Sequence, residues 1–290
     1  MKFGLAFASS VGTDSSSALE ICRHAEAVGF ESVWGGEHVI FPDQYESAYP
    51  YTADGRMPAE PETKIPDPLI WLAYVAATAP TLRLGTCILI VPQRNPIVLA
   101  KELATLDQLS DGRVELGIGV GWLEEEFAAL GIPWERRGSR TDEYIAAMRA
   151  LWAGPHAEFH GDFVDFDPVT CSPRPVQEHI PVIVGGDTPV AVRRAARIAD
   201  GYFPGTVDID QLRALMNDLE AAANVYGRSP GDIKVSAIFG GVQGDPVAAA
   251  EQMAAAGVYR AMIPGFFFTG PGGLERLSQF GEQVVSKLAD

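Results

Sequence analysis

One histidine in this sequence directly follows a short apolar run, a common position for groups that carry out chemistry. His38 comes after the run ESVWG, and Glu37 stands immediately before it. An imidazole gains and loses a proton near neutral pH, so His38 could act as a general acid or base or could hydrogen-bond to a cofactor ring. His38 could equally be a structural residue that anchors the long loop after it.

The four remaining histidines are placed differently. His24 lies within a helical pattern, and three others, His156, His160 and His179, lie in a long segment between two later apolar runs. None of them pairs with His38 at the spacing of metal ligands. A metal-dependent hydrolase would need a His-x-His pair and further ligands after later strands, so this class is disfavoured and we expect no metal site.

Alternating glycines occupy the stretch GIGVGW, from Gly117 to Trp122. Their spacing is G-x-G-x-G, whereas dinucleotide-binding folds use G-x-G-x-x-G after the first strand, so a Rossmann fold is disfavoured. Alternating glycines do leave one face of a strand end free of side chains. A flat ligand could approach the backbone closely there.

A second glycine turn opens the segment VGGDTPVAVRRAARIADG. Gly185 and Gly186 end an apolar run, Thr188 can cap the following helix, and Pro189 suits its first position. Free amide groups at such a helix start, beside a hydroxyl, can bind a phosphate. The same pattern also fits an ordinary turn between a strand and a helix.

Short apolar runs alternate with helical patterns along the whole chain, which predicts a parallel sheet built from βα units. The helical patterns end on glycine, as at Gly29 and Gly257, and Ser15 to Ser17 can cap the first of them. Eight such units, in about the usual length of ~250 residues, predict a (β/α)8 TIM barrel, with an open doubly wound sheet as the alternative. The eight predicted strands begin at Lys2, Glu31, Leu82, Arg113, Pro181, Gly201, Ile233 and Tyr259.

Two insertions are longer than ordinary connections. Residues 39–67 follow the second strand and are rich in proline and tyrosine, and residues 154–180 separate the fourth unit from the fifth. Long loops in compact domains are functional lids or disordered segments, and the tyrosines favour a lid over a solvated surface loop. We predict one domain over residues 1–290.

The composition limits the class of protein. A formal net charge of −16 argues against a nucleic-acid partner, which would need a basic surface. No apolar run approaches the length that spans a membrane, and the N-terminus reads directly into a strand. Three scattered cysteines without a CxxC pair suit a reducing compartment, so we expect a soluble cytoplasmic protein.

Several longer stretches resemble a known family. They are NPIVLAKELATLDQLSDGRVELGIGVGW, the spaced residues Phe159, Gly161 and Phe166, the run PRPVQ, and VGGDTPVAVRRAARIADGYFP. Together they resemble the luciferase-like flavin and deazaflavin oxidoreductases of the bacterial luciferase superfamily. The stretches EHVIFPDQYESAYPY and DEYIAAMRALW are most similar to its branch of probable F420-dependent oxidoreductases. The resemblance covers almost the whole chain.

The resemblance implies a barrel whose C-terminal mouth holds the cofactor ring against the third strand. The family often has a non-proline cis peptide there, which by position falls between Cys87 and Ile88. His38, with Glu37 before it, corresponds to the catalytic acidic-His pair beside the ring. The loops that correspond to those holding the ribityl chain and phosphate contribute Gly119, Val120, Gly121, Trp122, Gly185, Gly186, Asp187 and Thr188.

The function implied is hydride transfer between coenzyme F420 and a small, largely apolar organic substrate, with His38 handling the accompanying proton. Trp122 stands where the family's sugar-phosphate dehydrogenases carry an acid, and Phe266 to Phe268 add further aromatic surface. The alternatives are an FMN-dependent two-component monooxygenase, supplied by a flavin reductase, and a non-catalytic flavin-binding protein. Family members are commonly dimers, so we expect a homodimer formed through helices of the second and third units, and an F420 or flavin reductase is a further expected partner.

Overall fold

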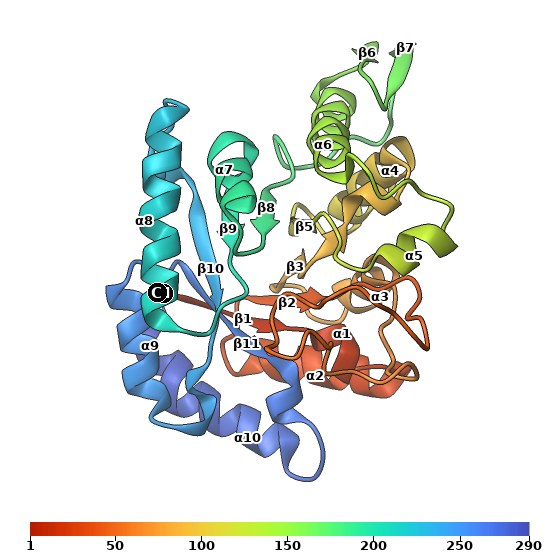
Figure 1. Cartoon of the computed structure of the whole chain (residues 1–290). Helices are drawn as coiled ribbons and strands as arrows, with labels where there is room; N and C mark the ends of the chain where they lie inside the picture. Colours follow the sequence, from red (N-terminus) through yellow and green to blue (C-terminus); the bar gives the residue numbers. More distant parts are fainter. Residues whose placement is uncertain (290) are drawn as a thin grey trace.

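The computed structural model describes residues 1–289, and its parallel strands close into a barrel (Figure 1). Each strand pairs with the next around the ring, β11 pairs with β1, and both β3 and β4 pair with β5. This closure confirms the (β/α)8 TIM barrel and excludes the open doubly wound sheet. The barrel strands are β1 (Lys2–Ala6), β2 (Ser32–Gly35), β3 (Arg83–Thr86), β4 (Leu89–Ile90), β5 (Val114–Gly119), β8 (Val182–Gly185), β9 (Gly201–Phe203), β10 (Lys234–Ile238) and β11 (Arg260–Pro264).

Every predicted strand is present, and the third is divided in two. The residues between β3 and β4 are Cys87 and Ile88, and the peptide bond that joins them is cis, as the resemblance implied. The divided strand therefore places a backbone irregularity at the C-terminal end of the barrel.

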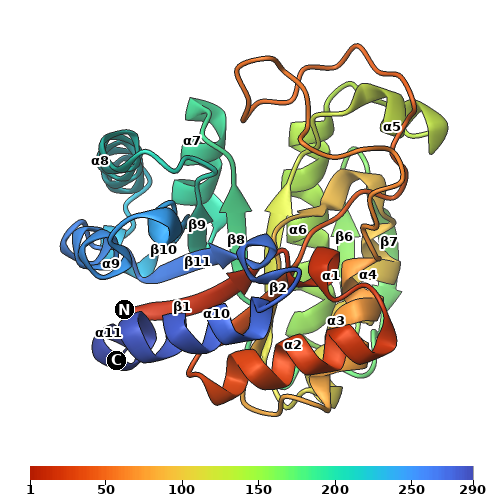
Figure 2. The ribbon, with the colours of Figure 1, turned by 90° about the horizontal axis from the view of Figure 1, so that it is seen from below.

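Helices surround the barrel and cover the outer faces of its strands (Figures 1 and 2). Shorter helical segments span residues 91–93, 230–232, 241–243, 265–268 and 281–285. The α-helices are α1 (Ala8–Val11), α2 (Ser15–Ala27), α3 (Pro68–Ala76), α4 (Pro96–Leu109), α5 (Glu124–Ala129), α6 (Arg137–Ala153), α7 (Pro189–Ile198), α8 (Ile209–Val225), α9 (Pro246–Ala255), α10 (Gly273–Phe280) and α11 (Ser286–Leu288).

The first long helix, α2, is capped by a residue other than the predicted serines. The Asp14 carboxylate accepts hydrogen bonds from the amides of Ser16 and Ser17, at 3.0 and 3.1 Å, and the Ser17 hydroxyl accepts one from the Asp14 amide. The prediction that Ser15 to Ser17 cap α2 is therefore confirmed only for Ser17, which completes a capping box, because the N-cap residue itself is Asp14. A carboxylate one residue earlier can accept both amides at once.

Trp34 fills much of the barrel interior. Its ring takes the space that side chains would occupy at Gly4 on β1 and Gly85 on β3, and it lies 5.0 Å from the Arg260 guanidinium on β11. Contacts with several strands at once require the ring to lie inside the barrel. The larger apolar core lies between the strands and the surrounding helices.

A buried ion-pair network joins four strand starts at the N-terminal end of the barrel. Arg260, which is 1% exposed, binds Glu31 through Nε at 2.9 Å and Glu115 through Nη1 at 2.9 Å. Arg83 also pairs with Glu115. The guanidinium groups satisfy carboxylates that would otherwise be buried unpaired.

The two predicted insertions have different structures. Residues 36–67, between β2 and α3, form a long connection without helix or strand that passes beside α5 (Figure 2). The second insertion contains an unpredicted antiparallel hairpin of β6 (Ala157–His160) and β7 (Asp165–Val169). Its turn is held by Glu143 of α6, whose carboxylate accepts the amides of residues 162–164.

Within residues 1–289, no helix is both long enough and apolar enough to cross a membrane.

Candidate active site at the barrel mouth

An apolar floor lies at the C-terminal end of the barrel interior. Three of its side chains, Phe7, Ile88 and Ile238, are only partly buried, so they retain surface toward the mouth. Phe266, which is 54% exposed, stacks over Phe7 with 6.2 Å between ring centroids. A flat apolar ring could pack against this surface. The fully buried members below it are Ala6, Trp34, Cys87, Ile183, Phe203 and Met262.

His38 stands just beyond this floor and is held by a distant carboxylate. Gly36, two residues before it, packs against the Phe7 ring and the Cys87 carbonyl. The Nδ1 atom of His38 lies 3.1 Å from Oε2 of Glu126 on α5. Nε2 of His38 has no hydrogen-bond partner among residues 1–289. The structure therefore supports a fixed ring with one free nitrogen.

Glu37 points to other partners than its neighbour in the sequence. Its carboxylate accepts the amide of Ile90 at 2.5 Å and forms a close ion pair with Arg94, which also binds Asp67 at 2.6 Å. Burial raises the pKa of Glu37, and the charge of Arg94 opposes that shift. The predicted acidic-His pair is thus not formed by these two side chains, since the carboxylate that contacts His38 belongs to Glu126. The catalytic role predicted for Glu37 stays a prediction.

The glycines of the fourth strand accommodate neighbouring protein atoms. Side chains at Gly117, Gly119 and Gly121 would collide with the Thr86 carbonyl, the Ile88 side chain and the Phe127 ring respectively. Gly121 also has φ +81°, a conformation that favours glycine. Their spacing therefore reflects close packing against the divided third strand and α5. The predicted contacts of Gly119, Val120 and Gly121 with a cofactor remain predictions.

Trp122 is the centre of an aromatic cluster over the mouth. Its ring lies 5.8 Å from His38, 5.5 Å from Tyr45 and 5.1 Å from Tyr49, each edge to face. Phe41 joins the same cluster, 5.7 Å from His38. Phe41, Tyr45 and Tyr49 belong to residues 39–57, which we call the lid. The lid therefore packs onto the predicted site.

Two neighbouring glutamates of α5 fasten the lid. Glu126 accepts the amides of Val39 at 2.6 Å and Ile40 at 3.3 Å. Glu125 accepts the amide of Glu46 at 2.6 Å, and it also receives the amide and hydroxyl of the next residue, Ser47. The lid is consequently tied at two points, one beside His38 and one several residues further along.

Tyr51 carries the lid across to the other side of the mouth. Its ring lies against Gly205, so that a side chain at position 205 would overlap it, and its hydroxyl lies near Gly186. Burial raises the pKa of Tyr51, and the charge of Asp187 adds to the shift. The lid therefore reaches the loops that the resemblance assigns to the phosphate.

The start of α7 has the local structure that its sequence predicts. The Thr188 hydroxyl accepts the amide of Ala191 at 3.2 Å, and Pro189 takes the first helical position. Asp187 directs its carboxylate to the amide of Gly205 at 2.6 Å. Burial raises the pKa of Asp187, while this amide opposes the shift. The capping threonine is confirmed, and phosphate binding by this turn stays a prediction.

Arg137 brings a positive charge to the end of the fourth strand. Its Nε donates to the Gly121 carbonyl at 3.3 Å, and its guanidinium lies 3.5 Å from the centre of the Trp134 ring. Burial lowers the pKa of Arg137, and the charge of Glu124 acts in the opposite direction. Within residues 1–289, Arg137 forms no ion pair with a carboxylate, and its guanidinium contacts the Gly121 carbonyl and the Trp134 ring instead.

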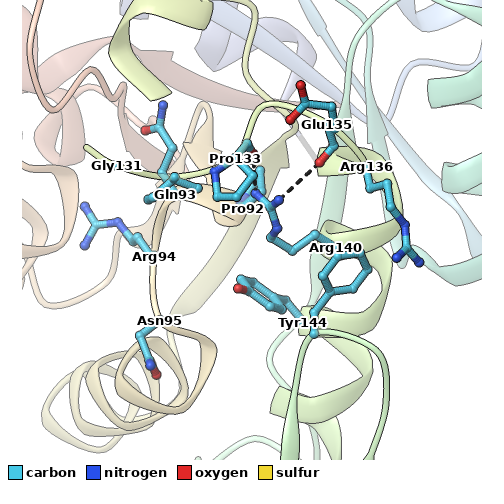
Figure 3. Close-up of a pocket in the computed structure, with 12 residues that line it drawn as sticks. Pro92, Gln93, Arg94, Asn95, Gly131, Pro133, Glu135, Arg136, Arg140 and Tyr144 are labelled. Carbon is cyan, nitrogen blue, oxygen red and sulfur yellow. Dashed lines mark hydrogen bonds between the residues drawn. The ribbon is translucent and has the colours of Figure 1, made fainter. Parts of the chain in front are cut away.

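A separate cavity of about 530 Å³ lies between the start of α4, the loop after α5 and helix α6 (Figure 3). Arg140 extends across it to donate to the carbonyls of Pro133 at 2.8 Å and Glu135 at 3.1 Å. Tyr144 and Phe163 line its other side. None of the predicted site residues lines this cavity, although Gln93 and Arg94, which do line it, are neighbours of Glu126 and Glu37.

Glu126, Arg137 and Tyr51 lie at the candidate site, although the sequence alone did not indicate them. Glu126 stands in the acidic run LEEEF, where three successive glutamates look alike. Only the helical phase of α5 distinguishes the buried Glu126 from its exposed neighbour Glu124. Arg137 likewise lies in a run of two arginines. The sequence signal that could have found Glu126 is the periodic burial of side chains expected along one face of a helix.

The comparisons agree with this architecture. Residues 1–283 match the family described as luciferase-like monooxygenase. An uncharacterised protein of Mycobacterium tuberculosis is 40% identical over 231 residues, which cover 78% of this chain and 81% of that protein. The FMNH2-dependent dimethylsulfone monooxygenase of Pseudomonas putida is 34% identical over 139 residues, which cover 47% of this chain and 38% of that enzyme. The F420-dependent tetrahydromethanopterin reductase of Methanopyrus kandleri has the same fold, with a TM-score of 0.77, 18% identity and 99% of both chains covered.

The chain therefore belongs to the luciferase-like family, a superfamily of oxidoreductases and monooxygenases. Proteins similar to it include one named for FMNH2 and one named for coenzyme F420. The predicted family and fold are confirmed.

Proposed function

We propose that this protein is an F420-dependent oxidoreductase that transfers a hydride between coenzyme F420 and a small, largely apolar organic substrate. The observation that carries the proposal is His38, whose Nδ1 contacts Glu126 while Nε2 has no partner among residues 1–289, and which follows Gly36 where the chain packs against Phe7 of the apolar floor. The sequence resemblance to the F420 branch favours this cofactor, and the fold shared with an F420-dependent reductase is compatible with it.

The residues at the mouth fit such a cofactor. The partly exposed side chains of Phe7, Ile88 and Ile238 offer an apolar surface for its ring. At the start of α7, Pro189 has no N–H and Thr188 accepts the Ala191 amide, so the Val190 amide would face its phosphate, together with the positive charge of Arg137. When bound, F420 would supply a ring carbon that gives or takes a hydride.

The residues of this chain would position the substrate and move one proton. Removing a hydride from an alcohol carbon, for example, leaves a proton on oxygen, and a neutral His38 can take that proton at Nε2. In the reverse direction, the protonated ring can return it. Trp122, Tyr45 and Tyr49 would enclose the substrate in aromatic surface and exclude water, which suits an apolar molecule.

A second candidate is an FMN-dependent two-component monooxygenase. The FMNH2-dependent relative in Pseudomonas putida favours it. This enzyme would need a partner reductase to supply reduced flavin, whereas the F420 enzyme would draw on an F420 reductase. A non-catalytic flavin-binding protein would need no proton relay at His38.

We further propose a cytoplasmic homodimer that binds no nucleic acid or membrane. Helices α3 and α4 pack side by side, and they expose Ile70 (74% exposed), Tyr74 (48%) and Val98 (54%) to solvent. Apolar side chains on one outer face are what a second copy of this chain would cover. These helices are the ones of the second and third units.

The test of the reaction is a turnover assay with a panel of small apolar alcohols, ketones and enones. Each is incubated with the protein and F420 in the oxidation state the reaction requires, and the change in F420 absorbance is followed. We expect turnover with at least one member of the panel. Turnover that requires reduced FMN and oxygen instead would overturn the proposal in favour of the monooxygenase.

A further inference from the structure

The carboxylate of Glu126 has a specific set of contacts around His38. The residue is fully buried, at 0% exposure. Its Oε1 accepts the backbone amides of Val39 at 2.6 Å and Ile40 at 3.3 Å, while its Oε2 faces His38 Nδ1 at 3.1 Å. Oε1 therefore binds the backbone of the lid, and Oε2 contacts the His38 ring.

This carboxylate is ionised near neutral pH. Burial alone would raise the pKa of Glu126, but His38, the Gln93 amide and the Val39 amide outweigh burial and hold the pKa below its ordinary value. Gln93 is itself 8% exposed, and neither polar atom of its side chain has a partner with hydrogen-bond geometry. Its amide therefore lies near the Glu126 carboxylate without a well-formed hydrogen bond to it.

An ionised carboxylate can only accept hydrogen bonds. The short contact between Oε2 and Nδ1 therefore requires the proton to be on Nδ1 of His38. In a neutral imidazole, one nitrogen carries the proton and the other has a free lone pair. Nε2 is then the nitrogen left free to accept a proton, and it is the one without a partner among the described residues.

We infer that Glu126 is a positioning residue that fixes the tautomer of His38, so that the proton at the active site is exchanged at Nε2. The tautomer follows from the contacts alone, whereas its use in the reaction rests on the proposed function. Glu126 would also stabilise the imidazolium that forms when Nε2 takes the proton, because its charge lies next to the ring.

The substitution Glu126→Gln makes a sharp prediction because it changes one atom and keeps the shape. The two backbone amides of Val39 and Ile40 require an acceptor, so the glutamine oxygen should take the place of Oε1. The glutamine nitrogen then takes the place of Oε2 and donates to Nδ1. The proton of His38 must consequently move to Nε2, which inverts the tautomer.

The experiment is NMR of protein labelled with ¹⁵N at histidine, without cofactor or substrate. Imidazole ¹⁵N shifts and their two-bond couplings identify which nitrogen carries the proton, and the spectrum of His38→Gln assigns the His38 signals. We expect the Nδ1–H form in the wild type and the Nε2–H form in Glu126→Gln. Finding the same tautomer in both proteins, or an Nε2–H form in the wild type, would overturn the inference.

Two further variants keep the test interpretable. Glu126→Asp retains an acceptor-only carboxylate, so it should keep the wild-type tautomer. Glu125→Gln removes the same charge from the adjacent residue, whose contacts are with Glu46 and Ser47, and it should leave the His38 tautomer unchanged. Inversion in either variant would contradict a specific role of Glu126. If Glu126→Gln does not fold, loss of the Nδ1–H form of His38 in Glu126→Asp would contradict the inference.

An activity measurement separates this inference from the proposed function. With a substrate that the wild type turns over, Glu126→Gln should lower kcat by about tenfold or more and change KM little, since it alters proton transfer and not binding. An inverted tautomer with unchanged kcat would show that Glu126 sets the ring but that proton transfer at His38 does not limit the reaction, which would overturn the catalytic half of the inference. An inverted tautomer in a protein that lacks F420 activity would count against the proposed function alone.

Discussion

The Nδ1 atom of His38 lies 3.1 Å from Oε2 of Glu126, across 88 positions of sequence. His38 follows the second strand of the barrel, whereas Glu126 belongs to the short helix after the fourth. The contact joins the first turn of the lid to α5, because the same carboxylate also holds the amides of Val39 and Ile40. The buried side chain of Glu126 therefore holds both the His38 ring and the start of the lid in place.

The first prediction concerns His38 itself. Replacing it with alanine removes the proton carrier and leaves the apolar floor and the α7 turn in place. We expect turnover to fall by about tenfold or more while the dissociation constant of the cofactor is unchanged. Steady-state kinetics and a fluorescence titration measure the two quantities. Undiminished turnover would mean that a group other than His38 carries the proton.

The second prediction concerns stability and its dependence on pH. In the Arg260→Met variant, Glu115 stays buried with only Arg83 beside it, so the free energy of unfolding should fall by about 3 kcal/mol near neutral pH. Urea denaturation measures this loss.

The contact between Glu115 and Arg260 also predicts how the free energy of unfolding depends on pH. Burial would raise the pKa of Glu115, but Arg260 and Arg83 outweigh it and hold the pKa below its ordinary value of 4.5. A carboxyl group whose pKa is lowered by folding stabilises the folded state at pH values above its ordinary pKa. That stabilisation disappears as the pH falls through the lowered pKa. The difference between wild type and Arg260→Met should therefore shrink in acid. A difference that grows on acidification would contradict the network.

The third prediction concerns the lid. In Gly205→Ala, the new methyl group would overlap the ring of Tyr51, so the ring must leave its place. We expect faster hydrogen–deuterium exchange across residues 45–57, with the barrel strands unaffected. Gly154→Ala is the matched control, since no atom lies within 4 Å of a side chain added there. Equal exchange in Gly205→Ala and the wild type would mean that Tyr51 does not hold the lid.

The fourth prediction concerns the assembly. A glutamate at Ile70 or Val98 would place a charge on the exposed face of α3 and α4, where we expect the second copy to bind. Each variant should elute as a monomer, with its mass measured by light scattering. Val225→Glu, at a site 82% exposed on α8, should not change the mass of the wild-type protein. A monomeric wild type would refute the proposed homodimer.

The barrel could be predicted from the sequence because its strands are buried on both faces. Such strands read as continuous apolar runs, and glycines such as Gly29 and Gly257 mark the helix ends before them. The hairpin of β6 and β7 could not be predicted, since its residues are mostly exposed and form no continuous apolar run. What fixes its turn is Glu143 on α6, a tertiary contact that local patterns do not contain.

The site could be predicted in part. His38 was identifiable because it follows a predicted strand, but its partner was not. Glu37 is adjacent in sequence, yet successive side chains of an extended segment point to opposite sides, so Glu37 turns to Arg94 instead. The glycines of GIGVGW correctly marked the end of the fourth predicted strand. They do not leave open space for a ligand, because protein atoms lie beside them.

The most direct test of the central claim is an equilibrium titration of the purified protein with F420 and, separately, with FMN, each followed by fluorescence. The aromatic cluster around Trp122 lies over the expected ring site, so its emission should report binding. We predict saturable binding of F420 that is at least about tenfold tighter than that of FMN, a difference of about 1.4 kcal/mol. Tight binding of FMN with no detectable binding of F420 would contradict the account.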